Sequence, residues 1–150
     1  MKTRIKFFAV CLMAISSTLF SSCEEDGDIV KPVINLIAPE EGAVLEIGDD
    51  HGIHLDMILT DDVMLKSYKI DIHSNFDNHV HSRSTESTVD FSFNKSWDVS
   101  GRKATIHHHE IKIPADATPG NYHLLVFCID AAGNEADVVA RNIVLSHDGE

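Results

Sequence analysis

The sequence is poor in several features that identify common protein classes. It has three cysteines, 7% aromatic residues and no excess of positive charge. Its 12 Lys and Arg stand against 24 Asp and Glu, for a formal net charge of −12 at pH 7. Such a charge repels nucleic-acid phosphates and anionic lipid headgroups. We therefore expect no nucleic-acid partner, and no membrane attachment that relies on basic side chains.

The sequence also lacks an apolar run long enough to cross a bilayer. The longest run, Phe7 to Phe20, has about 14 residues and contains Ser and Thr, whereas a membrane-spanning helix needs about 20. Three basic residues precede this run within the first six positions, and two serines follow it. This order predicts a cleaved secretory signal peptide over residues 1–22 rather than a membrane-spanning anchor.

Cys23 comes directly after the predicted signal. The arrangement resembles a bacterial lipoprotein signal, in which such a cysteine is acylated and becomes the mature N-terminus. The resemblance implies lipidation at Cys23 and a membrane partner held through the lipid. The acidic run Glu24 to Asp28 resembles the surface-export signal of Bacteroidetes lipoproteins, and it also suits a solvated, flexible tether over residues 23–31. We expect an outer-membrane lipoprotein at the cell surface, or otherwise on the periplasmic face.

The cysteine count excludes a disulfide inside the mature domain. Cys11 is lost with the signal peptide and Cys23 carries the lipid, which leaves Cys128 alone. Cys128 lies in the most apolar segment of the chain. A thiol in that setting is expected to be an inert core residue rather than a nucleophile.

Residues 32–146 show the pattern of short strands and turns, without a helical period. Ile53, Leu55, Met57 and Leu59 alternate with polar residues, as in a half-buried strand. The pattern predicts an all-β, immunoglobulin-like antiparallel sandwich of about seven strands, followed by a tail at 147–150. The expected strands cover residues 33–37, 53–60, 65–73, 88–93, 105–113, 122–130 and 136–145.

Two local motifs near the C-terminus support this fold class. Pro119-Gly120-Asn121-Tyr122 and the run from Asp130 to Asn134 resemble the last part of bacterial immunoglobulin-like domains. The resemblance implies that Tyr122 makes a corner contact and that an Asp-x-x-Gly-Asn turn joins the last two strands.

Histidine is unusually abundant, with ten in the chain. Because alternate residues of a strand share a face, His79 can cooperate with His81, and His107 with His109. His108 is expected to point the other way. Neutral imidazole and carboxylate are ligands for Zn²⁺ and Cu²⁺. The candidate metal ligands are His73, Asp77, His79, His81, His109 and His123.

Two other interpretations of the histidines stay open. In the first, the histidines are solvated surface residues. In the second, His107 and His109 lie at the rim of the core, because Ile111 and Ile113 occupy positions of the same parity in the strand. A third hypothesis is pH sensing, because an unperturbed histidine titrates near pH ~6.5.

Several segments together carry a family resemblance. The chain resembles a Bacteroidetes lipoprotein family that is catalogued as a domain of unknown function, DUF4625. The resemblance rests on the predicted lipoprotein signal and on the segments Ile72 to His79, His109 to Pro114 and Gly120 to His123. The resemblance implies an immunoglobulin-like sandwich on the cell envelope and names no activity or ligand.

The motifs of common enzyme classes are missing from the sequence. There is no Gly-x-Ser-x-Gly elbow and no phosphate-binding glycine-rich loop. We therefore expect no enzymatic activity, and no cofactor other than the divalent metal, Zn or Cu, of the alternative below. The expected role is a binding or accessory module with a protein or glycan partner, and the alternative is a His-rich lipoprotein that binds Zn or Cu.

Overall fold

The structure, a computed structural model, describes residues 27–75 and 88–148, and in these ranges it contains strands and no helix. Accordingly, no membrane-spanning helix occurs in the described part of the chain. The strands are β1 (Val33–Ala38), β2 (Ala43–Glu46), β3 (Ile53–Thr60), β4 (Leu65–Ser74), β5 (Phe93–Asp98), β6 (Lys103–Ile111), β7 (Gly120–Asp130) and β8 (Val139–Ser146).

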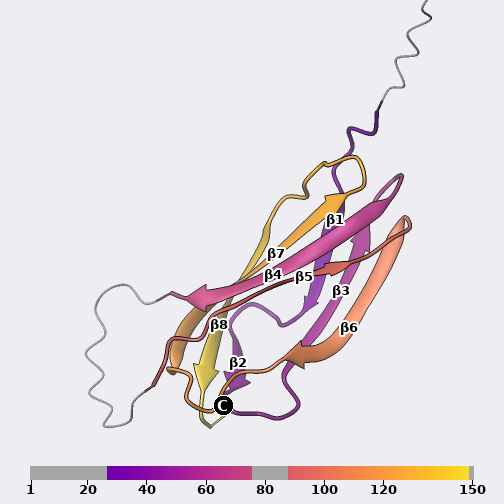
Figure 1. The fold of residues 1–150 in the computed structure, drawn as a ribbon. Helices are drawn as coiled ribbons and strands as arrows, with labels where there is room; N and C mark the ends of the chain where they lie inside the picture. The colour runs from indigo at the N-terminus through magenta and orange to yellow at the C-terminus, as the bar shows by residue number, and fades with distance from the viewer. Residues whose placement is uncertain (1–26, 76–87, 149–150) are drawn as a thin grey trace, which may run out of the picture.

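The strands form two sheets, which confirms the predicted all-β sandwich (Figure 1). One sheet has three strands in the order β1-β3-β6, and the other has five in the order β2-β8-β7-β4-β5. Neighbouring strands within each sheet pair antiparallel, except that β2 runs parallel to β8. β7 lies in the middle of the five-stranded sheet, as expected for its apolar sequence.

The core lies between the two sheets and follows the alternation seen in the sequence. Leu55, Met57 and Leu59 of β3 are fully buried, and Ile70 of β4 and Val126 of β7 are buried opposite them in the second sheet. Burial of each such side chain contributes roughly 1.5–3 kcal/mol to folding. The residues between them point outward. Those of β3 and β4 are mostly polar, whereas β7 presents Leu125, Phe127 and Ile129 on its outer face.

Both C-terminal motifs adopt the predicted contacts. The Tyr122 hydroxyl donates to the Thr118 carbonyl oxygen at 2.8 Å and accepts from the Phe91 N–H at 3.2 Å. The Asp130 carboxylate accepts the backbone N–H groups of Gly133 and Asn134 at 2.6 and 2.8 Å, which forms the turn between β7 and β8. The expected corner and turn are therefore confirmed.

The predicted strand at 88–93 is wrong. The alternation there is real, but Val89 forms an isolated bridge with Ala117, and Phe91 is held by the Tyr122 hydroxyl rather than by a neighbouring strand. The pairing with β4 begins at Phe93, and β5 covers Phe93–Asp98. An amphipathic period shows which residues face the core, but it does not show which backbone groups pair.

β2 was not predicted. It has four residues, too few for a periodic pattern, and it exists because its backbone pairs with β8, about 100 residues later in the chain. The boundaries of the other predicted strands shift by one to three residues, except those of β3. The larger shifts are in β6 (Lys103–Ile111), in β7, which begins at Gly120, and in β8, which begins at Val139.

β1 begins at one end of the sandwich, and β8 ends at the other (Figure 1). The side-chain amide of Asn134, in the β7–β8 turn, donates to the Asp28 carbonyl oxygen at 3.0 Å, so the segment before β1 lies against this turn. β3 ends beside the start of β1, since Thr60 pairs with Val33. We call this end, which holds Asp28, the β3–β4 turn and the β7–β8 turn, the N-terminal end of the sandwich.

Candidate functional site

Three histidines cluster on the outer face of the three-stranded sheet. His54 comes from β3, and His107 and His109 come from β6, the strand that pairs with it. All three are exposed. The ring centroid of His54 lies 4.9 Å from that of His107 and 4.9 Å from that of His109, and the last two are 5.8 Å apart. We call these three residues with Asp56 the His54 cluster.

Part of this cluster has the spacing of a metal site. One ligand atom each from His54, Asp56 and His107 lies within 4.8 Å of the other two. Asp56 is the direct cross-strand partner of His107, so the carboxylate and the imidazole share one face of the sheet. Two imidazoles and one carboxylate form a ligand set that suits Zn²⁺ or Cu²⁺. The ring of His109 lies next to His54 but is not part of this group.

A β-bulge creates this arrangement. Between the pairs Leu55–His108 and Ile53–Ile111, β3 advances by two residues and β6 by three, so β6 carries one extra residue. The extra residue reverses the parity: His107 and His109 are exposed, whereas Ile111 is buried. The interpretation that placed His107 and His109 on the same side as Ile111 is therefore wrong, because it assumed an unbroken period of two.

Gly52 packs against the bulge from the turn before β3. Its φ is +80°, a region in which side chains are disfavoured. A Cβ atom there would lie 2.6 Å from the His109 carbonyl oxygen and 2.7 Å from that of Ile111. The absence of a side chain thus lets the turn approach the bulged backbone closely.

The candidate ligands on the other sheet form a separate pair. His73 of β4 and His123 of β7 are direct cross-strand partners on the outer face of the five-stranded sheet, and their ring centroids are 5.6 Å apart. His73 Nδ1 lies 2.8 Å from Asp71 Oδ1. The core separates this pair from His109, so the three do not share one site. Asp77, His79 and His81 lie outside the described residues.

Sequence reasoning missed His54 and Asp56 as ligands. Both occupy outward positions of the β3 alternation, which was visible in the sequence. Their proximity to His107 depends on the register between β3 and β6, about 50 residues apart in the chain. A single sequence does not give that register.

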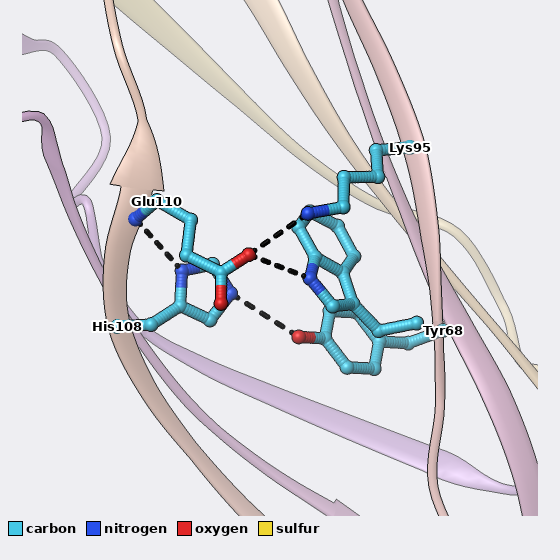
Figure 2. Close-up of polar contacts among 5 residues, drawn as sticks. Tyr68, Lys95, His108 and Glu110 are labelled. Atoms are coloured by element: carbon cyan, nitrogen blue, oxygen red, sulfur yellow. Dashed lines mark hydrogen bonds and ion pairs between the residues drawn. The ribbon is translucent and has the colours of Figure 1, made fainter.

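His108 points inward, as expected, and joins a polar cluster between β5 and β6 (Figure 2). Its Nε2 atom lies 3.1 Å from the Tyr68 hydroxyl oxygen. The Glu110 carboxylate accepts from Lys95 Nζ at 2.9 Å and from Trp97 Nε1 at 3.0 Å. These contacts connect the two sheets along one side of the sandwich.

The hydrogen bonds of His108 define its tautomer. The Glu110 backbone N–H donates to Nδ1 at 3.3 Å, so Nδ1 is an acceptor and the proton of the neutral ring lies on Nε2, which donates to Tyr68. Partial burial lowers the pKa of His108 and outweighs the nearby negative charge of Glu110, which raises it. The neutral ring is therefore the form that fits this position.

Trp97 packs against neighbouring side chains of the sandwich. Its ring stacks on Tyr68 with centroids 5.0 Å apart and planes 10° from parallel, and Lys95 Nζ lies 4.7 Å from its centroid. A tryptophan that binds sugars needs an open face. The structure thus assigns Trp97 to the closure of the sandwich.

Cys128 is a buried free thiol. Burial raises its pKa to about 11, and the nearby carboxylates of Asp61 and Asp130 act in the same direction. A thiol with this pKa holds its proton at neutral pH.

One known protein family matches most of the chain. A family described as a domain of unknown function (DUF4625) matches residues 20–146. The match includes every strand of the sandwich and the His54 cluster. A search of curated proteins found no match. Because the family match covers most of the chain, this protein belongs to the DUF4625 family.

Proposed function

We propose that the protein is a lipid-anchored module of the cell envelope that binds one Zn²⁺ or Cu²⁺ ion through His54, Asp56 and His107. The observation that carries the metal assignment is the convergence of these three ligand atoms within 4.8 Å of one another on an exposed face. Zinc holds nitrogen ligands at about 2.0–2.1 Å. The side chains of His54 and His107 are exposed and would have to rotate toward Asp56 to bring their nitrogens to these distances.

The charge of the protein favours cation binding. The formal net charge of −12 attracts cations to the surface, and Asp56 places a carboxylate among the imidazoles. An exposed zinc site with three protein ligands leaves a coordination position for a further group. Such a site fits a protein that stores, delivers or senses an ion, or that binds a partner through it.

The anchor is supported by the sequence pattern around Cys23 and by the direction of the chain. β3 runs from the His54 cluster toward the N-terminal end of the sandwich, and six residues of strand separate His54 from Thr60, about 20 Å. A lipid at Cys23 would thus hold the N-terminal end toward the membrane. The His54 cluster would face away from it.

The alternative is a binding module for a protein or glycan partner that uses no metal. The outer face of the five-stranded sheet supports this alternative, because Leu125, Phe127 and Ile129 alternate there on the central strand and are half-buried. The two functions differ in their response to chelator. A metal-dependent module loses its ligand in EDTA, whereas a plain interaction module keeps its partner.

Titration of the untagged protein with Cu²⁺ tests the site, with detection by electron paramagnetic resonance. We expect one equivalent to bind with hyperfine coupling to two or three nitrogens. In the variant His107→Gln, the spectrum should show one coordinating nitrogen fewer. The affinity for Cu²⁺ should fall at least tenfold. His147→Gln removes an exposed histidine elsewhere and serves as the control. Loss of binding in His73→Gln but not in His107→Gln would overturn the assignment in favour of the other sheet.

A further inference from the structure

Three carboxylates gather at the N-terminal end of the sandwich, away from all the histidine groups. Asp28 precedes β1, Asp61 follows β3, and Asp130 ends β7. One oxygen from each lies within 4.8 Å of the other two. Segments from three distant parts of the chain thus bring their charges to one point.

The hydrogen bonds leave one buried oxygen without a partner. Asp28 Oδ1 accepts from the Val30 N–H at 3.0 Å, and Asp61 Oδ2 accepts from the Val63 N–H at 3.3 Å. Asp61 Oδ1 is buried and has no hydrogen-bond partner among the described residues. A buried acceptor without a partner destabilises the fold, and such atoms are rare in native proteins.

Hydrogen bonds from the β7–β8 turn hold the carboxylate of Asp130 in place. Its Oδ1 accepts from the Gly133 and Asn134 N–H groups, and its Oδ2 accepts from the Asn134 side-chain amide at 2.7 Å. Asp130 is also completely buried. A buried carboxylate therefore lies in the group, with an oxygen within 4.8 Å of an oxygen of Asp61.

The described residues supply no positive charge to balance this group. Their ion pairs join Lys31 to Asp137, His51 to Asp49, His73 to Asp71 and Lys95 to Glu110, and none involves the three carboxylates. Like charges at this spacing repel one another, the more so where solvent is excluded. A cation would remove the repulsion and supply the missing partner of Asp61 Oδ1.

We propose that Asp28, Asp61 and Asp130 bind a Ca²⁺ ion. The ligand atoms are all oxygen, which calcium prefers and which distinguishes this group from the His54 cluster. Calcium holds oxygen ligands at about 2.3–2.6 Å, so two of them around one ion are up to about 5 Å apart, as found here. Water molecules would complete the coordination on the exposed side of Asp28.

The ion would fix the start of the domain in place. Asp28 belongs to the segment that precedes β1, whereas Asp61 and Asp130 belong to the rigid turns of the two sheets. Asn134 already contacts this segment through its bond to the Asp28 carbonyl oxygen. Calcium would add a strong link from this segment to Asp61 and Asp130, so that the sandwich has a defined orientation relative to its N-terminal tether.

Thermal unfolding of the full chain after removal of metals with EGTA, followed by titration with Ca²⁺ or Mg²⁺, tests the site. We expect Ca²⁺ to raise the Tm with half-saturation on the order of 10⁻⁴–10⁻³ M, as in extracellular calcium modules. Mg²⁺ should have a much smaller effect, because it requires a smaller octahedral site. Limited proteolysis between residues 24 and 32 should slow by at least fivefold with Ca²⁺.

Asp61→Asn is the test variant, and Asp62→Asn, its exposed neighbour, is the matched control. Asp61→Asn should lose the Ca²⁺-dependent rise in Tm, and Asp62→Asn should keep it. Asp28→Asn, which lies before the first strand, provides a second variant if Asp61→Asn does not fold. Equal responses of Asp61→Asn and the wild type, or no response of the wild type up to 10 mM Ca²⁺ (roughly tenfold above the expected range), would overturn the proposal.

Discussion

His108 Nε2 lies 3.1 Å from the hydroxyl oxygen of Tyr68, and this contact joins the three-stranded sheet to the five-stranded sheet. The same ring accepts a backbone N–H at Nδ1. The bond at Nδ1 requires the neutral imidazole, because a protonated Nδ1 cannot accept. Protonation would turn Nδ1 into a donor that faces the Glu110 N–H, which is also a donor. The ring position that brings Nε2 to Tyr68 therefore depends on pH.

The free energy of unfolding should therefore fall on mild acidification. The pKa of His108 is lowered in the folded protein, so the unfolded chain takes up a proton first, near pH ~6.5. Stability is full above that pH and is lost as the pH falls toward the folded-state pKa. Urea unfolding between pH 7.5 and 5 measures the loss, and His108→Gln should show a flatter profile. Parallel profiles for the two proteins would contradict this assignment.

Gly52 should tolerate a side chain much less well than Gly101. Both have φ of +80°, but a Cβ at Gly101 meets nothing within 4 Å, whereas one at Gly52 meets two carbonyl oxygens. Gly101→Ala should cost about 1 kcal/mol, the penalty of the left-handed conformation alone. Gly52→Ala should cost about 2 kcal/mol more, because the bulge of β6 has to move. Equal costs in chemical denaturation would show that the bulge is not tightly packed.

Tyr122→Phe should be strongly destabilising for the loss of one oxygen atom. Its hydroxyl is the partner of the Phe91 N–H and the Thr118 carbonyl oxygen, and Tyr122 is completely buried. Leaving buried backbone groups unpaired costs about 1–3 kcal/mol. Tyr68→Phe is the comparison, because its partner His108 is half-buried and water can replace the lost bond. Denaturation midpoints should fall more for Tyr122→Phe than for Tyr68→Phe.

The N-terminal anchor gives a prediction about covalent structure. Mass spectrometry of the protein from its native membrane should find a first residue Cys23 that carries a diacylglyceryl group and an amide-linked acyl chain. Cys23→Ser should abolish the modification and leave residues 1–22 attached. Cys11→Ser, a change within the signal, should leave the modification intact. An unmodified Cys23 in the wild type would remove the lipid anchor from the account.

The sequence predicted those features that depend on local pattern. The alternation from Ile53 to Leu59 gave β3 and its buried face, and the motif at Asp130 gave the last turn. Residues 88–92 continue the same alternation but do not form a strand, because their backbone bonds to the Tyr122 hydroxyl and to the loop at Ala117. β2 was missed because a four-residue strand is defined by its partner and not by its own period.

The candidate site shows the same division. The parity rule correctly placed His107 and His109 on one face and His108 on the other. It failed beyond His109, where the bulge reverses the alternation and buries Ile111. It did not find His54 or Asp56, since their proximity to His107 follows from the pairing of two strands that are distant in the sequence.

Elemental analysis of untagged protein, purified without chelator and then loaded with Zn²⁺ or Cu²⁺, tests the metal-binding function most directly. We expect close to one ion per chain after removal of weakly bound metal, and a ratio near zero for the double variant His54→Gln/His107→Gln. A ratio near zero for the wild type, or an unchanged ratio for the double variant, would contradict a metal site on the three-stranded sheet.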